Sequence, residues 1–124
     1  MTRQPRARLA LTSPARGVHV VAVHGTLDRV AGIRLLRLVE VRVRMMRDQR
    51  APTRRLIIDV TDVDGADRDG LTTLRIARDD ARRRGVTIDL VGDLSAIAAP
   101  SSPERRSLAL LAHPTLGAAL DART

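Results

Sequence analysis

The chain has 124 residues, the size of one ordinary domain, and its 22 arginines against 14 acidic residues give a formal net charge of +8. It has no cysteine, so disulfides and thiolate metal sites are excluded, and no apolar run approaches the ~20 residues that span a membrane. It also has no aromatic residue, and its arginines are interleaved with aspartates, so a stacking groove for single-stranded nucleic acid is not predicted.

Two short strands are predicted near the N-terminus. Residues 7–11 (ARLAL) alternate in polarity, and residues 18–24 (VHVVAVH) are rich in β-branched side chains. The segment SPARG (13–17) between them has the composition of a turn, and we expect Gly25 to end the second strand.

A long helix is predicted over residues 29–47, with Asp28 as its N-cap. The stretch VEVRVRM alternates as a strand does, but Gly32 is the only turn signal in the segment. On a helical wheel one arc is apolar, and it consists of Leu35, Leu36, Val39, Val43 and Met46. Leu38, Val41 and Met45 fall outside this arc. They belong either to a wide core face or to a contact with a partner or a second copy, so a homodimer is one assembly to test.

The middle of the chain alternates strands with helices. RRLIIDV (54–60) has the solid apolar centre of a strand covered on both faces. From Gly70 onward apolar and small residues recur three or four apart, and Gly85 stands where a helix C-terminus favours a left-handed residue. VTIDLVG (86–92) is predicted as the next strand.

The C-terminal part is less regular. Pro100 and Pro103 argue against a long helix between residues 93 and 107. Residues 108–112 are predicted as a last short strand and 114–122 as a short terminal helix. Because no repeat or linker marks a second domain, the sequence predicts one α/β domain over residues 1–124, a mixed sheet of four or five strands with helices packed on it.

The segment DVTDVDGADRDGL (59–71) contains five aspartates and raises three interpretations. An EF-hand calcium loop fits no register, since a start at Asp62 places Thr73 where the bidentate glutamate is required. A phosphoaspartate site resembling a receiver domain needs a lysine, and the chain has none. The third interpretation is a loop before a helix, where Asp67 or Asp69 caps unpaired N–H groups.

The order of these motifs resembles the STAS domain, the fold of the anti-sigma factor antagonists. The resemblance covers residues 7–122 and is carried by G-x-L-D at 25–28, by LIIDV at 56–60 and by D-x-x-G-L at 67–71. It implies a single STAS-like domain that regulates bacterial transcription through protein–protein interaction.

In this family the second helix normally begins Asp-Ser-Ser/Thr-Gly, and the anti-sigma factor is a kinase that phosphorylates the first serine. The unphosphorylated domain binds the anti-sigma factor and frees the sigma factor, and the phosphorylated domain releases it. The resemblance places Arg68 at the acceptor position and Asp69 at the next one, so serine phosphorylation cannot switch this chain. Thr72 and Thr73 are alternative acceptors, and Thr61 is a poorer one.

The resemblance also implies a partner-binding surface at the start of the second helix. Its predicted residues are Asp28, Asp64, Asp67, Arg68, Asp69, Gly70 and Thr72. The implied partner is an anti-sigma factor of the GHKL kinase type or a related regulator. The Arg68 guanidinium favours permanent binding, or a partner with an acidic pocket. The alternative is a soluble accessory subunit of a membrane transport or lipid-transport complex.

No enzyme is predicted. The three histidines are scattered, and neither a Ser-His-Asp order nor a glycine-rich phosphate loop is present, so no catalytic residue, metal or cofactor is assigned. The first residues are basic but lack the apolar core of a signal peptide. We therefore expect a cytoplasmic protein without membrane insertion or direct nucleic-acid contact.

Overall fold

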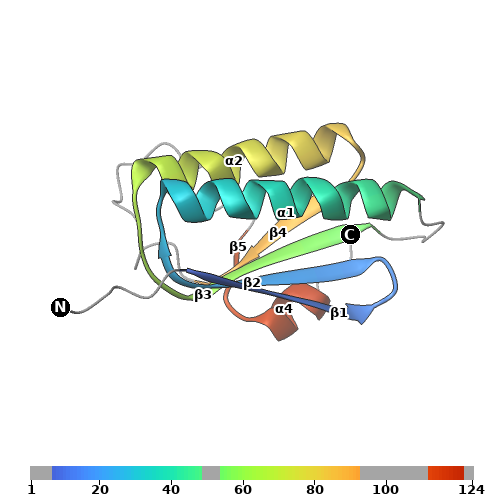
Figure 1. Cartoon of the computed structure of the whole chain (residues 1–124). Coiled ribbons are helices and arrows are strands. Elements are labelled where there is room, and N and C mark those ends of the chain that lie inside the picture. Colours follow the sequence, from blue (N-terminus) through green and yellow to red (C-terminus); the bar gives the residue numbers. More distant parts are fainter. Residues whose placement is uncertain (1–6, 49–53, 93–111, 122–124) are drawn as a thin grey trace.

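A computed structural model describes residues 7–48, 54–92 and 112–121. Five strands lie side by side in chain order, and they are β1 (Arg8–Ala15), β2 (Val18–Leu27), β3 (Arg55–Ala66), β4 (Thr87–Val91) and β5 (Ala112–His113). β1 is antiparallel to β2, and the other neighbours are parallel. α1 (Arg29–Asp48) and α2 (Arg68–Arg83) cover one face of the sheet, and α4 (Leu116–Asp121) lies on the other (Figure 1). This mixed sheet with packed helices confirms the predicted α/β class.

The long helix predicted after Asp28 is confirmed as α1. Its buried residues recur mostly three or four apart, and they are Ala31, Gly32, Leu35, Val39, Val43 and Met46. Of the three apolar residues outside the predicted arc, Leu38 packs partly against this core, whereas Val41 and Met45 remain exposed. The core therefore accounts for Leu38 and leaves the other two on the surface.

A smaller apolar cluster lies between the sheet and α4. It consists of Val18, Val20, Ile57, Val91 and Ala119. A buried charge borders it: Arg55 donates through Nε to Asp89 Oδ2 at 3.0 Å and through a terminal nitrogen to the Ala119 carbonyl oxygen at 2.6 Å. A buried arginine requires such partners, and here they join β3, β4 and the end of α4.

The first two strands are longer than predicted. β1 continues through most of the predicted turn to Ala15, with an irregular register between Thr12 and Ala15. This is tolerated because Pro14 lies in an edge strand, where one missing N–H costs little. Gly25 does not end β2, which runs on to Leu27; the glycine instead adopts a φ of 99° within the strand.

The acidic segment is not the predicted loop, because β3 continues through it to Ala66. Its backbone pairs with the extension of β2, so that Gly25 lies opposite Val63 and Leu27 opposite Ala66. Burial of Val63 supports this extension, while the aspartates on either side of it are exposed. Residues that look like a loop by composition therefore form an irregular parallel strand pair.

The remaining elements follow the predictions closely. α2 begins at Arg68, two residues before Gly70, and Gly85 has the predicted left-handed conformation with φ of 77°. β4 lies within the predicted 86–92, and α4 within the predicted 114–122. The predictions for 93–107 and for most of 108–112 fall on residues 93–111, which lie outside the described part.

Candidate functional site

Both long helices begin at the same end of the molecule, beside the ends of β2 and β3 (Figure 1). Each is capped by an aspartate. The Asp28 carboxylate accepts a hydrogen bond from the Ala31 N–H at 2.9 Å, and the Asp67 carboxylate accepts one from the Gly70 N–H at 2.8 Å. The cap predicted at Asp28 is confirmed, and of the two candidates for α2 the structure selects Asp67.

The β3–α2 junction is held directly against the β2–α1 junction. The Asp67 N–H donates to the Leu27 carbonyl oxygen at 3.2 Å. A methyl group at position 70 would lie 2.0 Å from that same oxygen, so only glycine permits this approach. The Thr26 hydroxyl donates to an Asp64 carboxylate oxygen at 2.9 Å across the two strands. The segments 25–28 and 64–70, separate in sequence, thus form one surface.

The exposed part of this surface is the turn into α2. Asp67, Arg68 and Asp69 are exposed, whereas Gly70 and Leu71 are buried beneath them. No ion pair joins Arg68 to a described carboxylate. Within the described residues, the Arg68 side chain is therefore exposed and forms no ion pair.

The three threonines considered as alternative acceptors differ in their hydrogen bonds. The Thr73 hydroxyl donates to the Asp69 carbonyl oxygen at 2.7 Å, and this side chain packs where α1 approaches α2 at Gly32. The Thr61 hydroxyl donates to the Asp59 carboxylate. Thr72 is half-buried in the first turns of α2. Thr72 is thus the one of the three whose hydroxyl makes no hydrogen bond among the described residues.

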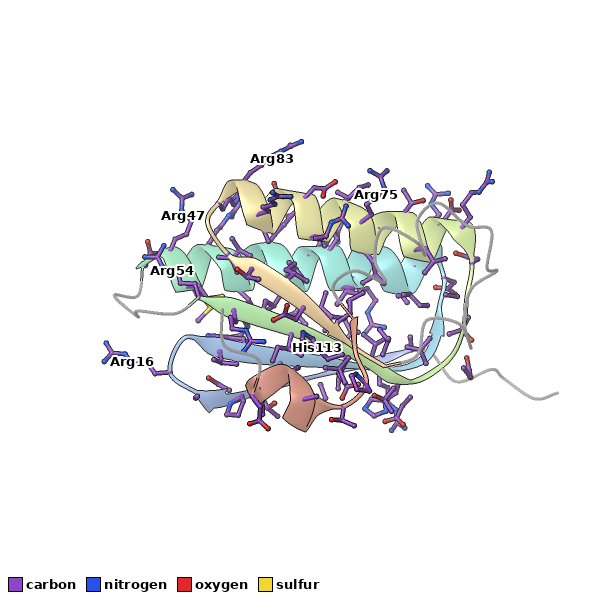
Figure 2. The ribbon with its side chains drawn as sticks, turned by 180° about the vertical axis from the view of Figure 1, so that it is seen from behind. Arg16, Arg47, Arg54, Arg75, Arg83 and His113 are labelled. Atoms are coloured by element: carbon purple, nitrogen blue, oxygen red, sulfur yellow. The ribbon has the colours of Figure 1, made fainter. Side chains whose placement is uncertain are left out.

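Aspartates are concentrated at the end of the molecule where the two long helices begin. Five aspartates lie at or next to the helix starts, and they are Asp28, Asp62, Asp64, Asp67 and Asp69. Figure 2 shows Arg16, Arg47, Arg54 and Arg83 at the opposite end, where α1 and α2 finish. Carboxylates near helix N-termini and arginines near C-termini both stabilise the helix dipoles.

Two groups at this site were not predicted from the sequence. The Leu27 carbonyl oxygen and the Thr26 hydroxyl join the two junctions, and next to them His24 Nδ1 lies 3.3 Å from Asp62 Oδ2. Only the parallel pairing of 24–27 with 62–66 brings these groups together, and composition does not reveal that pairing. Within the described residues, no three His, Asp or Glu side chains gather closely enough to hold a metal ion.

Comparison with solved structures places this arrangement among known folds. An anti-sigma factor antagonist from Mycobacterium paratuberculosis superposes with a TM-score of 0.64 at 23% identity, over 92% of this chain and 91% of that one. The Bacillus cell fate determinant SpoIIAA, in its phosphorylated form, gives a TM-score of 0.63 at 16% identity, over 92% and 97%. The murine anion transporter Slc26a9 gives 0.58 at 16% identity, over 84% of this chain but 17% of the transporter.

No family model and no curated protein matches the sequence. The likeness is therefore one of structure, and it extends over nearly the full length of both anti-sigma factor antagonists. None of the helices among the described residues combines the length and apolar composition that a membrane span requires. The chain has the STAS fold, the fold of the anti-sigma factor antagonists.

Proposed function

We propose that this chain is a protein-interaction regulator that acts as an anti-sigma factor antagonist does, through the surface formed by its β2–α1 and β3–α2 junctions. The observation that carries the proposal is the exposed Arg68 at the first position of α2, directly after the capping Asp67, where no described carboxylate pairs with it. Its partner would be a GHKL-type anti-sigma kinase or a related regulator. The proposal assigns no catalysis to the chain and locates it in the bacterial cytoplasm.

The charge at the start of α2 would determine whether such a surface binds its partner. A phosphoserine there would add about −1.5 to −2 charges beside the helix N-terminus, whereas Arg68 adds a fixed positive charge. SpoIIAA has been solved in unphosphorylated and phosphorylated forms, so that protein alternates between two charge states. By analogy, a side chain without a hydroxyl would hold this chain in one binding state.

A pull-down with the cognate anti-sigma kinase tests the proposal. We expect the wild type to retain the kinase and Arg68→Glu to weaken retention at least about tenfold, because a charge reversal at a recognition contact costs of the order of 1.4 kcal/mol or more. Arg83→Glu is the matched control, since Arg83 is exposed at the far end of the same helix. Equal retention of all three proteins would contradict the proposed surface.

Phosphorylation assays test the loss of the switch separately. Incubation with the kinase and ATP should leave the wild type unmodified, and Arg68→Ser should gain phosphate at residue 68. Mass spectrometry of the wild type decides between the substitutes: phosphate on Thr72 or Thr73 would show that a switch has moved along the helix and not disappeared.

The likeness to Slc26a9 supports a second candidate, an accessory subunit that docks on a membrane transport complex. It would use the same fold with a different partner. Recovery of a permease or transport ATPase subunit by the wild type, with no anti-sigma kinase, would favour this candidate over the first.

A further inference from the structure

The outward face of α1 carries aliphatic side chains that the core does not use. Val30 is 66% exposed, Val41 51% and Met45 42%, and arginines stand between them. We call this set the α1 stripe, and it consists of Val30, Arg34, Arg37, Val41, Arg44 and Met45. Single exposed aliphatic residues are normal on a protein surface, but three on the outward face of one helix, with arginines between them, make this face a candidate contact surface.

The residues of the α1 stripe lie on one line along the helix. Residues 30, 34, 37, 41 and 44 follow one another at intervals of four and three, so they share one face; three of the five are arginines, and the line is therefore not an apolar coiled-coil seam. On a helical wheel this line lies opposite the buried row that contains Leu35, Val39 and Val43. The stripe is thus a mixed apolar and basic line on the outward face of a helix whose inner face already packs on the sheet.

A hollow adjoins the N-terminal end of the stripe. It has a volume of about 750 Å³ and is lined by Ala7, Arg8, Asp28, Val30, Ala31 and Arg34. Arg34 donates to the Ala7 carbonyl oxygen at 2.8 Å, which fixes its guanidinium at the rim. The hollow thus combines two arginines with the Asp28 carboxylate, which is itself engaged in capping α1.

We propose that the α1 stripe binds an amphipathic helix of a partner protein, whose contacting face alternates aliphatic side chains with carboxylates. The valines and Met45 supply the apolar contacts, and Arg34, Arg37 and Arg44 supply the charge to be matched. Among described carboxylates, none forms an ion pair with these three arginines. A facing helix with glutamates beside its seam would pair with them, as flanking charges do in coiled coils.

Two other occupants fit the stripe less well. A second copy related by a two-fold axis would place the stripe against itself and bring Arg37 and Arg44 near identical arginines. An anionic membrane would attract the arginines, but lipid-surface helices bury a wide apolar face, and the wide apolar face of α1 is already in the core. The chain also has none of the aromatic residues that anchor helices at a lipid interface.

Fluorescence anisotropy with two designed peptides tests the proposal on the full chain. The probe is a labelled helical peptide of three heptads, with leucine at positions a and d and glutamate at e and g; the matched peptide has lysine in place of every glutamate. We expect the glutamate peptide to bind with a dissociation constant below about 100 µM, and at least about tenfold more tightly than the lysine peptide.

Variants on the stripe and off it then separate this surface from others. Val41→Asp should reduce binding of the glutamate peptide at least about tenfold. Ile76→Asp, the matched control at an exposed aliphatic residue of α2, should leave it unchanged. The double variant Arg37→Glu with Arg44→Glu should reverse the preference and bind the lysine peptide. Arg68→Glu should have no effect, so this test succeeds or fails independently of the proposed function.

Several results would overturn the proposal. They are no binding of the glutamate peptide at that concentration, equal binding of the two peptides, or equal effects of Val41→Asp and Ile76→Asp. A dimer in sedimentation velocity that Val41→Asp dissociates would show that a second copy occupies the stripe. Flotation with phosphatidylglycerol vesicles that Val41→Asp abolishes would show that it is a lipid contact.

Discussion

Replacing Gly70 by alanine should destabilise the protein even though the residue lies in a helix. Alanine is the better helix former by about 1 kcal/mol, so propensity alone predicts a gain in stability. In the structure, however, the added methyl would lie 2.0 Å from the Leu27 carbonyl oxygen and 2.8 Å from its carbon. Contacts of a Cβ below 3.0 Å essentially do not occur, so the start of α2 would have to move by about 1 Å.

The size of the effect follows from what that movement disturbs. It would lengthen and weaken the 3.2 Å hydrogen bond from the Asp67 N–H to the Leu27 carbonyl, worth about 1 kcal/mol. It would also strain the packing of Leu71 and Leu74 beneath the helix, for which overpacking costs about 1–3 kcal/mol. After the gain in helix propensity is subtracted, we expect a net loss of about 1–3 kcal/mol in the free energy of unfolding.

Urea denaturation followed by far-UV circular dichroism measures this loss, since the chain has no tryptophan or tyrosine for fluorescence. With a slope of about 1–3 kcal/mol per molar urea, the midpoint should fall by about 1 M. Gly65→Ala is the matched control: nothing lies within 4 Å of the added methyl, so stability should change by no more than about 0.5 kcal/mol. A Gly70→Ala protein as stable as the wild type would refute the reasoning.

Three further substitutions test the site and the core by the same denaturation assay. Asp67→Ala should cost about 1 kcal/mol through loss of the cap on the Gly70 N–H, and a smaller loss than for Asp69→Ala would contradict the assignment of the cap. Arg55→Ala should cost about 3–5 kcal/mol, because the largely buried Asp89 carboxylate loses its closest partner and keeps, among described residues, only His113 Nε2 at 3.7 Å; a surface-like loss near zero would show that the Arg55–Asp89 pair is not buried in solution. His19 is a buried residue of β2, and its burial, and secondly the charge of Arg42, lower its pKa below 6.5, so the unfolded chain binds the proton more readily. Stability should therefore be complete above about pH 6.5 and fall as the pH drops below it, by a larger amount in the wild type than in His19→Gln.

The elements that the sequence predicted correctly are those whose side chains repeat with a clear period. α1 and α2 bury residues three or four apart, and their start and stop signals are local: an aspartate cap before each helix and Gly85 after the second. The segment V-E-V-R-V in α1 alternates as a strand does, but the sequence still predicts a helix because no turn residue interrupts the segment. Local rules of this kind need no knowledge of the rest of the chain.

The errors occurred where distant segments determine the conformation. Gly25 and the acidic segment both have loop composition, yet they pair with each other as parallel strands up to Leu27 and Ala66. Burial of Val63 supports that extension, and nothing within the segment itself reveals the pairing. The same pairing assembles the candidate site, which is why Thr26 and the Leu27 carbonyl were missed.

In the β3–α2 junction, the residues that hold the backbone in place differ from the residue whose side chain is exposed on the surface. Asp67 is needed as a cap and Gly70 for the close approach to Leu27, so both have structural roles whatever the partner is. Arg68 makes no comparable contact among the described residues; its side chain is exposed and its charge is not neutralised by a described carboxylate. The side chain at position 68 can therefore change without disturbing the fold, and a change there alters mainly the charge that a partner meets. Under the proposed function, recognition therefore falls to Arg68, whereas the structural roles of Asp67 and Gly70 hold whatever the partner is.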